Sequence, residues 1–181
     1  LPRYREAVAA MDGLLASRAG PPGAAYERAL MYGELGAELS ARGDDPLAAW
    51  GEALSEYERM LAEDPNHLKA TLNTAMVRHA QSTWKAANGQ EPSAEFKLAA
   101  EAYGRAISLQ PERWEFVHDL AYHWHCWGDW RRRQGESADE QYAKAVERYR
   151  MAIRLHPKSA MSAVNEAVVH RLLALSEQAR G

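Results

Sequence analysis

Apolar and polar positions along the chain follow the period of an α-helix. Before several of the prolines, apolar residues recur three and four positions apart, as Ala99, Tyr103, Ala106 and Ile107 do, which places them on one helix face. β-branched residues are sparse and no segment alternates with period two, so strands are not expected. The pattern predicts eight helices, at roughly 2–18, 23–41, 46–63, 67–87, 92–109, 113–133, 138–155 and 159–179.

One helical sequence pattern recurs every 46 residues. Pro65, Pro111 and Pro157 close it, and a tyrosine stands eight positions before each of these prolines. Further columns with the same step are Ala7, Ala53, Ala99 and Ala145; Ala29, Ala75, Ala121 and Ala167; Tyr4, Trp50, Phe96 and Tyr142; and Gly43, Gly89 and Gly135. A fixed period of this length indicates a helical repeat whose units stack on one another.

The second helix of each unit resembles that of the tetratricopeptide repeat. An alanine, an aromatic residue, a small or apolar residue and a proline stand in register as Ala53-Tyr57-Met60-Pro65, Ala99-Tyr103-Ala106-Pro111 and Ala145-Tyr149-Ala152-Pro157, and more weakly as Ala7-Met11-Leu14-Ala19. The usual repeat has about 34 residues, so each unit here carries about 12 more, enough to lengthen both helices by roughly 9 Å. The chain is thus similar to a long-helix variant of that class.

The resemblance implies an all-α fold, a right-handed α-α superhelix of about eight antiparallel helices. Residues 1–181 would then form a single domain, with units at roughly 21–66, 67–112 and 113–158 and partial units at 1–20 and 159–181. The resemblance also implies a concave groove, lined by the first helices of successive units, that holds a peptide or a helix of a partner.

The residues expected in this groove flank the second alanine column and share one helix face. The candidate contacts are Leu72, Asn73, Met76, His79, His118, Asp119, Tyr122, His125, Asn165 and Arg171, with Tyr26, Leu30, Gly33, Ala80, Cys126, Val164 and Val168 on the same face. Aromatic, histidine and methionine side chains suit an apolar or amphipathic segment. The column that holds Asn73, Asp119 and Asn165 has an alternative role, which is to satisfy polar groups between helices.

Chaperone-tail-binding members of the class grip a carboxylate with lysines and paired asparagines. At the matching positions this chain has Leu72 and His118 in place of lysine, and Leu30 and Met76 in place of asparagine. Only Asn73 matches, so recognition of a chaperone C-terminus is not expected.

The segment 114–133 concentrates four tryptophans, three histidines and the single cysteine in one predicted helix. His123 and Cys126 are three positions apart and could contribute to a metal site, but no paired-cysteine motif supports this. Packing between layers and a partner-binding surface are the alternatives for the aromatic residues. Arg131, Arg132 and Arg133 stand in the last turn of the predicted helix, where the helix dipole favours positive charges.

Composition limits the function further. The 181-residue chain has a net charge of −3 and a pI near 6.2, so no basic field favours nucleic acid. No apolar run is long enough for a membrane span, and the chain opens without a methionine or a signal core, as a processed segment would.

Because catalytic motifs are missing, we expect a non-catalytic protein-interaction module or scaffold, without a cofactor or a metal. Two alternatives stay open: a structural subunit that self-assembles through its repeat ends, and a ligand- or metal-binding accessory domain of an enzyme or transporter. The sequence does not indicate a compartment.

Overall fold

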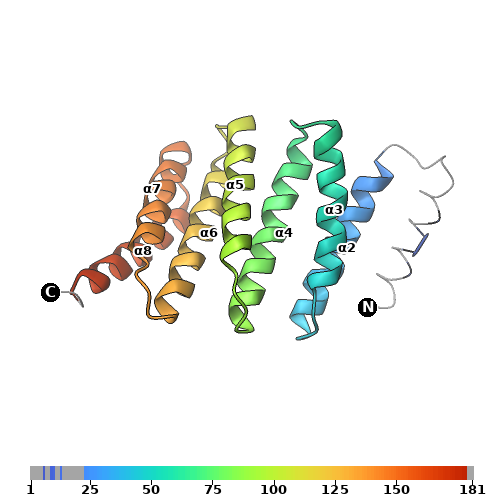
Figure 1. The fold of residues 1–181 in the computed structure, drawn as a ribbon. Coiled ribbons are helices and arrows are strands. Elements are labelled where there is room, and N and C mark those ends of the chain that lie inside the picture. The colour runs from blue at the N-terminus through green and yellow to red at the C-terminus, as the bar shows by residue number, and fades with distance from the viewer. Residues whose placement is uncertain (1–5, 7–8, 11–12, 14–22, 179–181) are drawn as a thin grey trace. The chain divides into compact units, whose positions relative to one another are not determined.

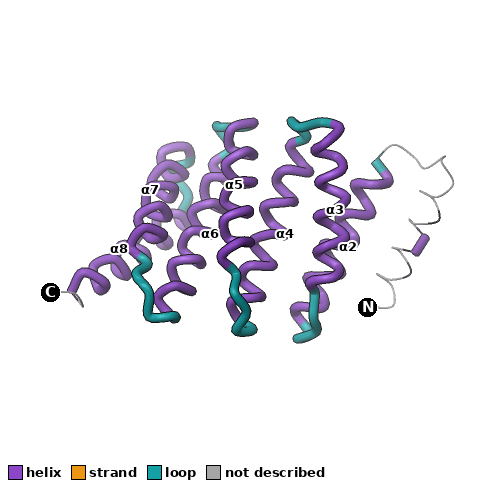
Figure 2. The backbone as a smooth tube through the Cα atoms, in the orientation of Figure 1, coloured by secondary structure: helices purple, strands orange, loops and turns teal. Residues whose placement is uncertain are grey.

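The computed structural model of the protein describes residues 6, 9–10, 13 and 23–178, and over this part of the chain it contains helices and no strands. The helices are α2 (Ala24–Ala41), α3 (Leu47–Glu63), α4 (Leu68–Ala87), α5 (Ser93–Leu109), α6 (Trp114–Arg133), α7 (Asp139–Leu155) and α8 (Ala160–Gln178) (Figures 1 and 2). Each bound lies within one residue of its prediction, so the all-α helical repeat is confirmed. The predicted helix at 2–18 lies outside the described residues apart from four isolated positions.

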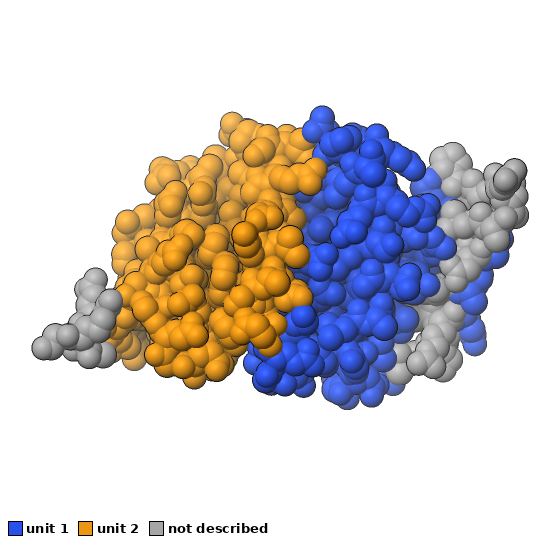
Figure 3. All heavy atoms as spheres, in the orientation of Figure 1, with its two compact units in different colours: residues 1–90 blue, residues 91–181 orange. Residues whose placement is uncertain are grey.

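Contacts within the chain divide it into two compact units, residues 1–90 and residues 91–181 (Figure 3). The first unit contains α2, α3 and α4, and the second contains α5 to α8. Consecutive helices within each unit are joined by short turns and run antiparallel (Figure 1). The single-domain organisation and the hand of a superhelix remain predictions.

The repeated prolines lie in the turns rather than at the start of the following helix. Asp64, which precedes Pro65, has extended backbone angles (φ −131°, ψ 95°), because a proline disfavours helical geometry in the residue before it. The proline begins a short turn, and α4 starts at Leu68, three residues later.

The repeated glycines end the first helices. Gly43 and Gly135 have φ values of 80° and 75°, the left-handed conformation that closes many helices. After each of them the chain turns back: the Asp44 amide donates to the Leu39 carbonyl at 2.9 Å, and the Glu136 amide donates to the Arg131 carbonyl at 3.0 Å. Glycine is therefore required at this column for its backbone conformation.

Each unit has its own apolar core built from the repeat columns. In the first unit Ala29, Trp50, Ala53 and Tyr57 are buried together with Val77, and in the second unit the cluster is Ala121, Tyr142, Ala145, Tyr149 and Val169. The alanine columns leave room for close helix packing, and the aromatic columns fill the remaining space. The tyrosine of the repeated pattern thus lies in the core, whereas the prolines that close the pattern are exposed.

Candidate functional site

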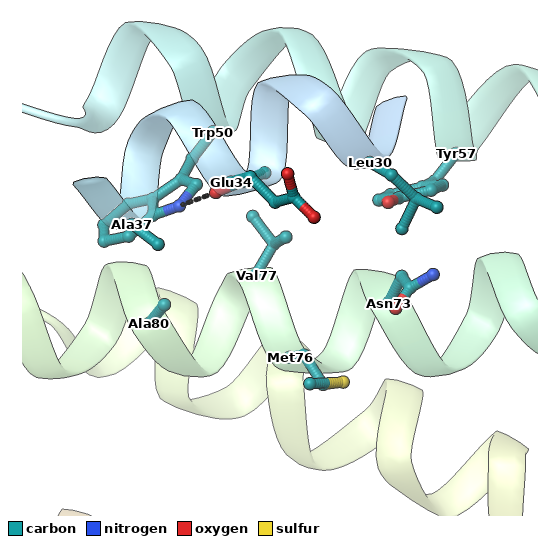
Figure 4. Close-up of a pocket in the computed structure, with 10 residues that line it drawn as sticks. Leu30, Glu34, Ala37, Trp50, Tyr57, Asn73, Met76, Val77 and Ala80 are labelled. Carbon is teal, nitrogen blue, oxygen red and sulfur yellow. Dashed lines mark hydrogen bonds between the residues drawn. The ribbon is translucent and has the colours of Figure 1, made fainter. Parts of the chain in front are cut away.

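The first helices of the first unit, α2 and α4, enclose a cavity of about 250 Å³ (Figure 4). Its lining is Leu30, Gly33, Glu34, Ala37, Trp50, Tyr57, Asn73, Met76, Val77 and Ala80. Asn73 and Met76 are two of the contacts predicted from the sequence. The cavity lies on the face that sequence reasoning assigns to the groove.

Small residues create this hollow. Gly33 and Ala37 on α2 and Ala80 on α4 line the cavity, and a methyl group added at Gly33 would lie 3.9 Å from Val77. The Trp50 indole of α3 forms one wall, held by donation from its N–H to the Gly33 carbonyl at 3.2 Å. A second hollow of about 520 Å³ shares Ala37, Trp50 and Ala80 with the first. The groove therefore continues along α2 and α4.

The polar groups at this cavity are a carboxylate, an amide and a phenol. Glu34 is exposed and its carboxylate points toward the hollow (Figure 4), while the Asn73 amide donates to the Tyr26 hydroxyl at 2.8 Å. Burial raises the pKa of the Tyr57 hydroxyl, and Tyr26, Glu27 and Glu34 raise it further. The cavity is thus apolar inside and acidic at its rim.

The corresponding place in the second unit is filled by side chains. Two repeat steps along the chain, Gly33 becomes His125, Ala37 becomes Asp129 and Trp50 becomes Tyr142. The His125 ring lies 6.2 Å from the Tyr142 ring, and the Tyr142 hydroxyl donates to Asp129 at 2.7 Å.

The half-buried His125 ring also lies 3.6 Å from the Asp129 carboxylate. Burial lowers the pKa of His125, and Asp129 opposes that shift. A polar cluster thus replaces the apolar hollow in this unit.

A large apolar or aromatic side chain is exposed at one position in the first helices of both units. Met76 on α4 is 50% exposed, Tyr122 on α6 is 46% exposed and Val168 on α8 is 43% exposed. These residues are 46 positions apart, so their exposure follows from the repeat. Burying such side chains in a soluble protein is normally favourable, so the exposed ones mark a candidate contact surface on the first helices of each unit.

Two of the predicted histidine contacts are largely withdrawn from this surface. His118 is 8% exposed, and its Nδ1 atom lies 2.9 Å from the Ser162 hydroxyl. His79 is half-buried, and burial lowers its pKa to about 4. Burial lowers the pKa of His118 as well, so the neutral ring is favoured at both positions.

The remaining predicted contacts differ in exposure. Leu72, Asp119 and Asn165 are half-buried, and Arg171 is exposed. Burial raises the pKa of Asp119 to about 6, with a further contribution from Glu115. Asp119 therefore places a carboxyl group between the core and the surface.

His123 takes part in packing between α5 and α6. It is fully buried, its Nε2 atom lies 2.8 Å from the Phe96 carbonyl, and its ring is 5.4 Å from the Phe96 ring. Burial raises the pKa of Cys126 to about 11, which keeps the thiol protonated. Over the residues that the structure describes, no three histidine, cysteine or acidic side chains are grouped to hold a metal.

Sequence reasoning missed the cavity residues that α3 supplies, Trp50 and Tyr57, and it missed Glu34, Ala37 and Val77 on the first helices. Trp50 and Tyr57 belong to columns that were assigned to the core, and both are buried. The available signal was the loss of side-chain volume at Gly33 and Ala37 relative to His125 and Asp129. Comparing repeat with repeat, rather than reading each helix alone, could have found the hollow.

The last helix exposes a further apolar stripe. Met161, Val164 and Leu175 are 62%, 61% and 50% exposed, on the same helix as Val168. Separately, none of the described helices is both long and apolar enough to cross a bilayer.

Comparison with known proteins yields similarities of structure. No protein-family model matches the chain, and the search of curated proteins finds no match. The first tetratricopeptide domain of Spaghetti (RPAP3), solved bound to the HSP90 peptide SRMEEVD, has a TM-score of 0.49 at 17% identity over 81% of this chain and 93% of that chain. The crystal structure of MamA protein has a TM-score of 0.38 at 16% identity over 83% of this chain and 85% of that chain.

Proposed function

We propose that the chain is a non-catalytic protein-interaction module that binds a partner peptide or helix on its first helices. The observation that carries this proposal is the exposed column of Met76, Tyr122 and Val168. Side chains of this kind contribute most to the free energy of binding when a partner removes them from water. In the first unit the column lies beside an open, mostly apolar cavity, which adds a concave surface for a partner side chain.

Other residues of the same face support the binding role. Asp119 and Asn165 are half-buried and can pair with polar groups of a partner backbone, while the exposed Arg171 can pair with an acidic group. His118 is buried and contacts Ser162 of α8 and Tyr149 of α7, so it supports helix packing instead of meeting the partner. The set of proposed direct contacts is therefore narrower than the sequence prediction.

The test is affinity capture from cells that express the chain, comparing three forms of it. Met76→Ala with Tyr122→Ala should lower partner affinity by at least about 2 kcal/mol, roughly thirtyfold, with unchanged helicity in circular dichroism. Leu98→Ala is the matched control, because Leu98 is 43% exposed on a second helix, α5. Equal capture by the double variant and the control would remove the assignment.

The second candidate function is self-association through α8, favoured by the exposed stripe of Met161, Val164 and Leu175. The same capture distinguishes the two. A second copy of this chain as the recovered protein, retained by the Met76/Tyr122 variant, would support self-association instead.

A further inference from the structure

We propose that the cavity between α2 and α4 receives one large apolar side chain from a partner segment that carries a positive charge beside it. The inference rests on the proposed function and specifies its partner: a cationic amphipathic segment. The observations behind it are the size of the cavity, the charge at its rim and the difference between repeats.

The cavity has room for one large side chain and opens into a longer groove. Its volume is about 250 Å³, and the adjoining hollow of about 520 Å³ shares Ala37, Trp50 and Ala80 with it, so a partner segment that runs along the groove can place one side chain in it. The walls are mainly Leu30, Trp50, Met76 and Val77. Burial of an apolar side chain against these walls is favourable because it removes apolar surface from water. A leucine, methionine or phenylalanine side chain at the centre of a contact is the natural occupant.

The negative charge at the rim of the cavity favours a positive charge on the partner. Glu34 lines the cavity, and among the residues that line it there is no lysine, arginine or histidine. Within the part of the chain that the structure describes, Glu34 forms no ion pair. The negative charge of Glu27, which is also exposed, raises the pKa of the Tyr57 hydroxyl, as the charge of Glu34 does. A lysine or arginine one helical turn from the apolar anchor would pair with this carboxylate.

At the two positions where α2 carries small residues, the second unit carries larger side chains. In the second unit, His125 and Asp129 stand at the positions of Gly33 and Ala37 and contact Tyr142. The repeat framework can therefore hold larger side chains at these positions, and their absence from α2 leaves the cavity open.

The experiment begins with a random-sequence peptide library selected on the intact folded chain. The enriched peptides should share a large apolar residue with a lysine or arginine three or four positions away. Enrichment of acidic peptides, or of none, would overturn the proposal.

The dissociation constant of the best peptide is then measured against paired variants. Ala37→Leu fills the cavity from an exposed position, and Glu34→Lys reverses the rim charge; each should weaken binding at least about tenfold. Ala48→Leu and Glu52→Lys are the matched controls, because both positions are exposed on α3 and neither lines the cavity. Gly33→Ala provides a second, smaller filling variant, and thermal melts verify that each variant folds.

The outcomes separate this inference from the proposed function. Peptides whose affinity falls in the Met76/Tyr122 variant but is unchanged in the Ala37 and Glu34 variants would overturn the cavity assignment and leave the binding face intact. Peptides whose affinity changes in none of these variants would overturn both.

Discussion

Asp119 shows how one residue can serve both the core and the surface of this protein. It is half-buried on α6, next to Glu115 on its own helix and within electrostatic reach of Tyr103 on α5 and Tyr149 on α7. Burial raises its pKa to about 6, well above the value of about 3.9 for an unfolded chain. The folded chain therefore binds this proton more tightly than the unfolded chain.

The stability of the protein should reflect this proton. Because the pKa of Asp119 is higher in the folded chain than in the unfolded chain, protonation of Asp119 stabilises the fold. This stabilisation is fully present below about pH 4 and is lost as the pH rises through about 6. Asp119→Asn keeps the shape and removes the titration, so its melting temperature relative to the parent should rise between pH 4 and pH 7. Thermal melts of both forms across this range provide the measurement, and a constant difference would contradict the assignment.

At the scale of the helix, glycines with two different roles can be told apart. Gly128 on α6 is buried against Tyr142 of α7, and an added Cβ atom would lie 2.6 Å from that ring. Gly104 on α5 has nothing within 4 Å of the same added atom. Close helix packing requires glycine at the first position and not at the second.

The two alanine substitutions should therefore change stability in opposite directions. Gly128→Ala should destabilise the chain by roughly 1–3 kcal/mol through overpacking, despite the better helix propensity of alanine. Gly104→Ala should stabilise it by about 1 kcal/mol. Urea denaturation of both variants measures this, and a stabilising effect at both positions would refute the packing argument.

The helices could be predicted from the sequence because their signals are local. Gly43, Gly89 and Gly135 mark helix ends through their backbone conformation, and the prolines mark the turns. The cavity could not be predicted in the same way, because it depends on volumes that α2, α3 and α4 leave unfilled together. Likewise, helical spacing places His118 on the same face as Tyr122, but the hydrogen bond with Ser162 that accompanies its burial involves a residue 44 positions away.

At the scale of the whole molecule, the residues of the core repeat regularly, whereas the residues of the groove differ from repeat to repeat. The alanine and tyrosine columns recur in both units and are largely buried, whereas the groove column changes from Gly33 to His79, His125 and Arg171. Such changes are tolerated because the repeated columns, and not the groove residues, build the core of each unit. Binding specificity is therefore expected where the repeats differ.

The central claim is that the first helices, and not the second, meet the partner. Site-specific photocrosslinking tests it most directly, with a photoreactive phenylalanine in place of Tyr122, Met76 or the control Leu98, and mass spectrometry of the adducts from cells that express the chain. We expect the same partner to be crosslinked from positions 76 and 122 and not from position 98. Adducts from position 98 alone, or equal adducts from all three positions, would contradict the account.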